Sequence, residues 1–276
     1  SRGLGDVYKR QGLRLDQIDR TGSVTDEDHG DVDYYSIDDT TNSFAVSLGR
    51  ELSDTLDMSI GYASVERLPS VIELFMNGPH LATGRLETGN PNLKSETSNN
   101  FDITFNFDNG DYYGVASFYI NDVDNYITLM DEDDDHGDEN GDDEDEDDDH
   151  GDEHGDEHGN LIHANYVQEN AEFDGYEFEF GRILSLGSGE LTLSFGRDVV
   201  NAKFSDGHYV PRINPSRNIY SLAYTQDDLV FRLSMKDVDK QNDFGEGETA
   251  TDGYQMLDTR LTKSFDMSGK SKLRVS

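Results

Sequence analysis

Apolar and polar residues alternate with a period of two along most of this chain, and no helical period is sustained. In one segment, Phe101, Ile103 and Phe105 alternate with polar residues. Such alternation marks a β-strand whose two faces meet different surroundings. The same pattern occurs in 44–49, 56–63, 176–180, 191–195, 220–224, 229–236 and 257–265, and more weakly in 13–20, 112–128 and from residue 272. The sequence therefore predicts an all-β chain of about eleven strands.

The connections between these strands differ in length in a regular order. Tight connections at 50–54, 108–111, 185–189, 226–228 and 266–271 alternate with long ones at 22–41, 66–94, 130–162, 202–214 and 241–252. In an antiparallel up-and-down meander, alternate connections lie at opposite ends of the strands. We therefore expect the tight turns on one rim and the long loops on the other, as in outer-membrane barrels with short periplasmic turns and long extracellular loops.

Strand length separates the two architectures that fit this pattern. Strands in soluble β-sandwiches average about 5–6 residues, whereas a transmembrane strand needs roughly 9–11, which several of these segments reach. No apolar stretch approaches the roughly 20 residues of a membrane-spanning helix. The pattern favours a transmembrane β-barrel, and a soluble β-sandwich remains the alternative.

The charge of the chain narrows the classes of partner. Of its 276 residues, 59 are acidic and 22 basic, which gives a net charge of −37, and 19 of the acidic residues lie between Asp131 and Gly159. A nucleic-acid partner is therefore not expected, because phosphate binding needs Lys and Arg. The absence of Cys removes disulfides, thiolate zinc sites and thiol nucleophiles. Residues 1–11 lack the apolar region of a signal peptide and do not resemble the rest of the chain, so we regard them as a truncation boundary or a non-native start.

Several motifs carry a family resemblance. They are RLPSVIELFMNGPHLAT from Arg67, ETGNPNLKSE from Glu87, NAEFDGYE from Asn170, VPRINP from Val210, VDKQN from Val238 and TDGYQMLD from Thr251. In this order and spacing, the chain from residue 12 to 276 resembles TonB-dependent outer-membrane receptors. Its Asn-Gly-Pro-His sequence and its acidic, His-rich loop resemble the zinc-receptor branch of that family.

This resemblance implies a Gram-negative outer-membrane barrel of about 22 strands that surrounds a plug domain. It also implies coupling to the TonB–ExbB–ExbD complex through the plug, with the long loops extracellular. Residues 12–276 would supply about 11 of the strands as a partial barrel, while the plug and the other strands are not in this sequence. A receptor of this kind breaks no bond, so we expect no enzymatic activity and no prosthetic group.

All eight histidines lie in or beside the predicted long loops. They are His29, His80, His136, His150, His154, His158, His163 and His208. Imidazole suits zinc, copper and nickel, while carboxylate also suits calcium and magnesium. The loop 131–159 combines both groups, and we expect a disordered extracellular segment that captures Zn²⁺ or a related divalent cation as the transported ligand. The alternative is a solvated acidic segment with no specific ligand.

One motif match in this loop does not indicate a peptidase. His150-Gly-Asp-Glu-His154 fits the pattern H-x-x-E-H. A catalytic zinc site of that type needs both histidines on one face of a rigid helix, and Gly at every fourth position opposes a helix. No nucleophile elbow, phosphate loop or dinucleotide fingerprint occurs either.

The loop 66–94 holds a more ordered candidate metal site, formed by Glu73, His80 and Glu87. Its Gly and Pro residues suggest a fixed shape, and a carboxylate–imidazole pair could contribute to a zinc site that plug residues complete. Alternatively, both glutamates are ordinary loop carboxylates and His80 packs against the plug. We expect His29 and His208 to be accessory ligands at most.

Three functions remain in competition. The first is an outer-membrane receptor for a divalent metal, with zinc favoured. The second is a receptor of the same family for an iron–siderophore complex, haem or another organometallic ligand. The third, from a different class, is a soluble acidic metal-binding β-protein.

Overall fold

The computed structural model describes residues 7–25, 30–132, 161–267 and 272–276. Most of them lie in strands, and α1 is a single short helix among them. The elements are β1 (Val7–Thr25), β2 (Val32–Ser53), β3 (Leu56–Arg67), α1 (Val71–Phe75), β4 (Asn77–His80), β5 (Arg85–Thr88), β6 (Glu96–Asp108), β7 (Tyr112–Asp131), β8 (Ile162–Leu186), β9 (Gly189–Phe204), β10 (Arg217–Gln226), β11 (Leu229–Val238), β12 (Tyr254–Asp266) and β13 (Lys272–Val275).

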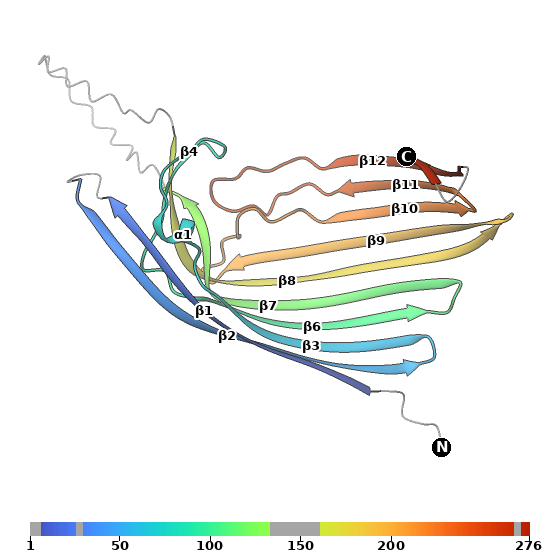
Figure 1. The fold of residues 1–276 in the computed structure, drawn as a ribbon, viewed down its shortest axis with the longest axis horizontal. Coiled ribbons are helices and arrows are strands. Elements are labelled where there is room, and N and C mark those ends of the chain that lie inside the picture. The colour runs from blue at the N-terminus through green and yellow to red at the C-terminus, as the bar shows by residue number, and fades with distance from the viewer. Residues whose placement is uncertain (1–6, 26–29, 133–160, 268–271) are drawn as a thin grey trace, which may run out of the picture.

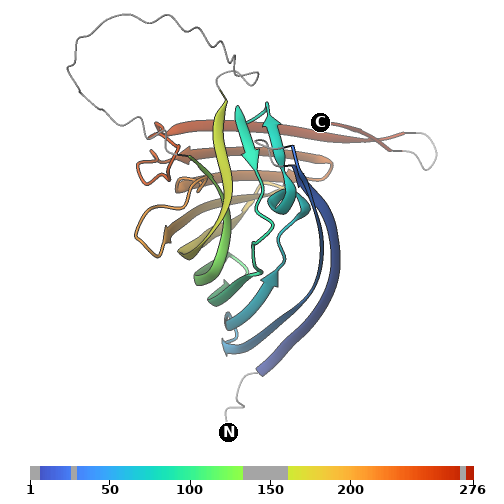
Figure 2. The same cartoon turned by 90° about the vertical axis from the view of Figure 1, so that its left-hand side faces the viewer.

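The strands form one curved sheet. Its order is β1-β2-β3-β6-β7-β8-β9-β10-β11-β12-β13, each strand antiparallel to its neighbours, while β4 and β5 lie off this path. The sheet bends into an open trough, and in the described part of the chain its edge strands β1 and β13 are not paired with each other (Figure 2). The predicted all-β antiparallel meander and partial barrel are therefore confirmed, with the expected eleven strands along the main path.

The two rims differ as the connection lengths predicted. Tight turns join β2 to β3, β6 to β7, β8 to β9 and β10 to β11 at one end of the sheet, and the long connections from β3 to β6, β9 to β10 and β11 to β12 lie at the other end (Figure 1). The first long connection is shorter than expected, because β1 and β2 extend until Thr25 pairs with Val32. Residues 33–42 are mostly polar, so the alternation was lost there, but a backbone ladder does not require apolar side chains.

Two segments predicted from the sequence, residues 1–11 and 131–159, lie only partly within the described residues. Residues 7–11 continue β1 and pair with residues 46–50 of β2. The described part of the acidic segment 131–159 is limited to Asp131 and Glu132, and the remainder lies outside the described residues. The assignments of residues 1–11 as a non-native start and of 131–159 as a disordered loop both remain predictions.

The two faces of the sheet carry different side chains. Helix α1 lies inside the curve of the sheet (Figure 2). Its Phe75 ring covers Gly22, where an added Cβ would lie 2.3 Å from a ring carbon. Because side chains alternate along β1, Leu13 belongs to the opposite, convex face. Strand register extends that face across the sheet through Phe44, Tyr62, Phe101 and Ile120, all of which are exposed. The convex face therefore presents an apolar surface.

No second sheet covers either face within the described residues, so the alternative of a two-layer sandwich is not supported. Buried apolar residues are few, and one small cluster consists of Ala171, Ala202, Phe204 and Val210. Among the described helices, none has the length and apolar character to cross a membrane.

On the concave face, aromatic side chains of one strand lie over glycines of the next. Tyr119 of β7 is paired with Gly175 of β8, where an added Cβ would lie 2.5 Å from the tyrosine oxygen and 2.3 Å from the carbonyl oxygen of Val199. Tyr113 covers Gly181 in the same way. These glycines allow the rings to lie flat across the strand junction.

Candidate functional site

The connection between β3 and β6, residues 68–95, folds into a compact element at the rim with the long connections; we call it the strap. It begins with α1, where Ser70 and Glu73 form a capping box. The backbone N–H groups of Gly89 and Asn90 donate to the carbonyl oxygens of Met76 and Glu73 at 2.6 and 2.9 Å. These bonds fold the strap back on itself beside the helix.

One side of the strap is bound to β1 and β2. The Arg20 side chain is buried, and its Nη1 donates to the carbonyl oxygen of Pro69 at 2.6 Å. Its Nη2 forms an ion pair with Asp39 of β2. The Phe75 ring packs against Tyr35, with 5.7 Å between ring centroids. A buried cation and an aromatic contact thus hold the helical end of the strap against the concave face of the main sheet, which we call the wall.

The other side of the strap is bound to β7 and β8. Strand β4 pairs with β5, and β5 runs parallel to the beginning of β8. Arg85 donates from Nε and Nη2 to the two oxygens of Asp131 at 2.6 and 2.7 Å. These hydrogen bonds raise the pKa of the Arg85 guanidinium above its usual value, against the opposing effect of burial. The backbone amide of Ile162 donates to the carbonyl oxygen of Gly84 at 3.1 Å. The hairpin therefore extends the wall at its rim.

The hairpin brings His80 and Glu87 together. His80 Nδ1 lies 2.8 Å from Glu87 Oε1, which also accepts from the Thr83 hydroxyl at 3.1 Å. The Tyr166 hydroxyl of β8 donates to the second carboxylate oxygen at 3.4 Å. Glu87 is only 3% exposed, whereas the His80 side chain is 49% exposed. A buried carboxylate therefore holds an accessible imidazole at the rim.

Glu73, the third residue predicted for this site, lies elsewhere in the strap. Its carboxylate accepts from Arg67 Nη1 at 3.0 and 2.9 Å and from the Ser70 amide at 2.6 Å. Arg67 also pairs with Glu96 at 3.0 Å. The structure thus joins two of the three predicted residues and assigns Glu73 to the helix cap.

The other predicted ligands do not join this pair in the described residues. His163 is exposed near the beginning of β8, where its carbonyl oxygen accepts from the Glu132 amide at 2.8 Å. His208 is exposed and its Nδ1 lies 2.8 Å from Asp206. No group of three or more His, Asp or Glu side chains suited to a metal occurs in the described part of the chain. The remaining predicted ligands lie outside the described residues: His29, His136, His150, His154 and His158.

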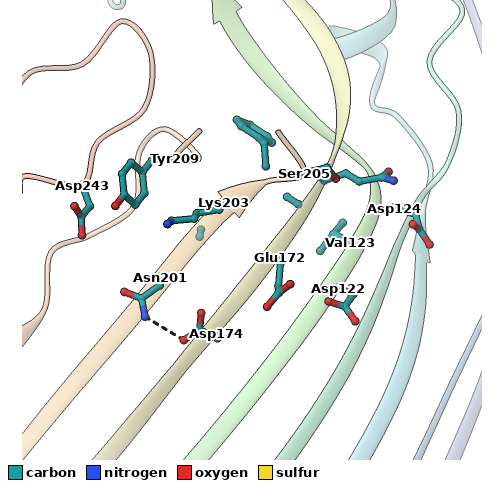
Figure 3. Close-up of a pocket in the computed structure, with 14 residues that line it drawn as sticks. Asp122, Val123, Asp124, Glu172, Asp174, Asn201, Lys203, Ser205, Tyr209 and Asp243 are labelled. Atoms are coloured by element: carbon teal, nitrogen blue, oxygen red, sulfur yellow. Dashed lines mark hydrogen bonds between the residues drawn. The ribbon is translucent and has the colours of Figure 1, made fainter. Parts of the chain in front are cut away.

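An acidic groove, separate from the His80–Glu87 pair, lies on β7, β8 and β9. The sequence analysis did not predict it. Its volume is about 640 Å³, and Asp122, Glu172, Asp174 and Lys203 line it (Figure 3). Asn201 donates to Asp174 at 3.0 Å, as the dashed line in Figure 3 marks. Register places Asp122, Glu172 and Lys203 on the same convex face as Ile120. The groove therefore opens away from the inside of the trough, where the strap lies.

The sequence analysis also missed three residues that contact the strap: Arg20, Asp131 and Tyr166. Each reaches the strap from a wall strand, and Arg20 and Pro69 are separated by 49 positions. Local patterns do not reveal such distant pairs. A usable signal for Glu73 was present, because Ser70-Val-Ile-Glu73 has the spacing of a capping box.

Comparisons with known proteins agree with the architecture. A family model described as TonB dependent receptor-like, beta-barrel, matches residues 11–276. Heme/hemopexin utilization protein C of Haemophilus influenzae is 36% identical over 92 residues, covering 28% of this chain and 13% of that protein.

Two solved structures extend the comparison to nearly the whole chain. The copper transporter OprC has a TM-score of 0.68 at 18% identity, covering 95% of this chain and 37% of OprC. The ferric yersiniabactin uptake receptor FyuA from Yersinia pestis has a TM-score of 0.61 at 13% identity, covering 94% of this chain and 35% of FyuA. At these identities the likeness shows the fold alone. The chain spans well under two thirds of the length of these relatives.

Proposed function

This chain belongs to the TonB-dependent receptor family of β-barrels, and on that premise we propose that it forms part of an outer-membrane transport receptor for a divalent metal, with zinc as the preferred ion. The metal is the transported ligand and the chain carries no catalytic role. The complete receptor works with the TonB–ExbB–ExbD complex through a plug domain. The strap and the other long connections face the extracellular side.

The observation that carries this proposal is the pair formed by His80 and Glu87 at the loop-bearing rim. Imidazole is a ligand for zinc, copper and nickel, and it rarely binds calcium or magnesium. The pair supplies one such ligand on an ordered element, the hairpin of β4 and β5, which pairs with β8. We expect residues of the plug domain to complete the coordination.

The charge of the chain supports a cationic ligand. A net charge of −37 creates a field that concentrates dications and repels anions. Haem carries carboxylate groups and gains nothing from that field. The exposed apolar convex face supports contact with outer-membrane lipid, as on the outside of transmembrane barrels.

A second candidate ligand is haem or a ferric chelate. The partial match to a heme/hemopexin utilization protein and the fold shared with a ferric yersiniabactin receptor support it. The fold is also shared with a copper transporter, so the relatives alone do not favour one class of ligand.

Direct binding measurements on the complete gene product in detergent micelles separate these candidates. The proposal predicts saturable zinc binding in calorimetric titration, and much weaker binding of Mg²⁺. Haem binding followed by absorbance is expected to be absent. Saturable binding of haem or a ferric chelate with no binding of zinc would overturn the proposal in favour of the second candidate.

A cellular measurement tests the transport step. Zinc uptake by zinc-limited cells that express the gene product is expected to disappear when TonB is deleted. Uptake that is independent of TonB would contradict the receptor mechanism. A gene product that stays in the soluble fraction and does not enter lipid vesicles would favour the soluble metal-binding protein.

A further inference from the structure

The two members of the metal-binding pair differ in burial, and this difference assigns them different tasks. We propose that Glu87 is a positioning residue, which keeps the proton of His80 on Nδ1 and thereby presents Nε2 to the metal. This inference rests on the proposed function, because it divides the roles within the same site. His80 touches the ion and Glu87 does not.

The hydrogen bond between the two side chains fixes where the proton lies. His80 Nδ1 is 2.8 Å from Glu87 Oε1. Both oxygens of the Glu87 carboxylate accept from hydroxyl groups, of Thr83 and of Tyr166, so this carboxylate acts as an acceptor and Nδ1 is the donor. In a neutral imidazole the other nitrogen then carries the lone pair. Nε2 has no hydrogen-bond partner in the described part of the chain, and it is therefore the nitrogen that is free to bind a cation.

The burial of Glu87 makes it a poor direct ligand. It is 3% exposed, and its oxygens already accept from three donors: His80, Thr83 and Tyr166. A cation would have to displace these donors to reach it. The His80 side chain, by contrast, is 49% exposed. Histidine ligands of zinc commonly donate their other ring N–H to a carboxylate in this way, which fixes the tautomer and the ring orientation.

The backbone around the pair holds this geometry in place. Glu87 lies on β5 opposite Ala164 of β8, which is fully buried, and next to Leu86, which is also buried. His80 lies on β4 opposite Arg85, whose guanidinium is bound to Asp131. The carboxylate is therefore fixed to the wall, and the imidazole is fixed to the carboxylate.

Glu73 provides a matched control for Glu87. Both are glutamates of the strap with bonded carboxylates, but Glu73 binds Arg67 and the Ser70 amide instead of His80. Replacement by glutamine preserves size at both positions. Only Glu87→Gln is expected to act on His80, because an amide can either donate to Nδ1 or accept from it.

The first test measures the tautomer in the metal-free complete gene product, with ¹⁵N-labelled histidine in micelles at a pH where the ¹⁵N spectrum itself shows a neutral His80 ring. The His80 signals are identified by their loss in His80→Gln. We expect the proton on Nδ1 in the wild type and in Glu73→Gln, and both tautomers in Glu87→Gln. A proton on Nε2 in the wild type would overturn the proposal.

The second test measures zinc affinity in the same variants. Loss of a carboxylate that orients a histidine ligand typically weakens metal binding about 10–100-fold, which we expect for Glu87→Gln. We expect Glu73→Gln to remain within about threefold of the wild type, and zinc to shift the Nε2 signal of His80 while Nδ1 keeps its proton. Equal effects of the two glutamine variants, or zinc binding through Nδ1, would overturn the assignment.

The two proposals fail in distinguishable ways. A wild-type protein that binds no zinc overturns the proposed function, whereas the metal-free tautomer is measured without any ion. A wild type that binds zinc, combined with an unaffected Glu87→Gln variant, overturns the positioning role alone.

Discussion

The strap and the wall of the trough are stabilised by different interactions. Neighbouring wall strands are joined by backbone ladders, such as the long pairing of β7 with β8, and few of their side chains are buried. The strap contains little regular secondary structure, and individual side chains hold it in place. Arg20 binds it on one side, and the Arg85–Asp131 ion pair binds it on the other. Single polar substitutions should therefore loosen the strap while the wall persists.

The largest expected effect is the release of the strap from β8 by Asp131→Asn. This change leaves the Arg85 guanidinium, whose side chain is only 19% exposed, without its carboxylate. Breaking a fully buried pair from one side costs roughly 3–5 kcal/mol, and we expect this partly exposed pair to cost less, about 2–3 kcal/mol. We expect hydrogen-exchange protection of the β5 amides to fall about 100-fold, while the amides of β9 keep theirs.

Asp227→Asn is the control for this substitution. Asp227 lies in the tight turn between β10 and β11 at the opposite rim, in a backbone conformation that Asn also tolerates. The same loss of charge there should leave β5 unchanged. Equal loss of protection in β5 and β9 after Asp131→Asn would show that the strap and the wall unfold as one unit. That result would contradict the proposed difference in how the two regions are stabilised.

A smaller effect is expected from a steric change in the wall, Gly175→Ala. The added methyl group would lie 2.3 Å from the carbonyl oxygen of Val199 and 2.5 Å from the Tyr119 hydroxyl. Overpacking of this kind lowers the free energy of unfolding by about 1–3 kcal/mol. Urea unfolding in micelles, followed by circular dichroism, measures the change.

Gly12→Ala is the matched control in a wall strand. Apart from its own residue and its two chain neighbours, no heavy atom lies within 4 Å of the Cβ position at Gly12. There the same substitution should be neutral or slightly stabilising, since it restricts the unfolded chain. Equal destabilisation at both positions would show that the Tyr119–Gly175 contact has no special role in the wall.

The smallest effect is expected at the beginning of the strap helix. Ser70→Ala removes the side chain that accepts from the Glu73 amide at 3.2 Å. Loss of such a cap costs about 1 kcal/mol, and Ser70→Thr should retain most of it. We expect exchange of the Glu73 amide to become about fivefold faster in Ser70→Ala alone. Equal exchange rates in the two variants would show that the cap does not limit the opening of the helix.

The same contrast explains what the sequence predicted. The wall was accessible because alternation such as that of Phe101 and Ile103 is local, and it gave the strands, their number along the main path and the two rims. It failed at residues 22–25 and 32–41, where polar residues on both faces conceal the ends of β1 and β2. The fold of the strap was not predictable, because Arg20 and Arg85 find their partners 49 and 46 positions away.

The candidate site was predicted in part for the same reason. His80 and Glu87 are seven positions apart, and the tight hairpin of β4 and β5 brings them into contact. Glu73 was grouped with them by sequence proximity, but its capping bond and Arg67 hold it elsewhere. The burial of Glu87 depends on the contact of β5 with β8, which no local pattern indicates.

The most direct test of the central claim is a zinc titration of a gene product in which a short Gly-Ser linker replaces residues 133–160, which isolates the strap from the acidic segment. The account predicts a saturable zinc site in this protein that disappears when His80→Ala is added. No saturable zinc binding, or the same binding with and without His80, would contradict it.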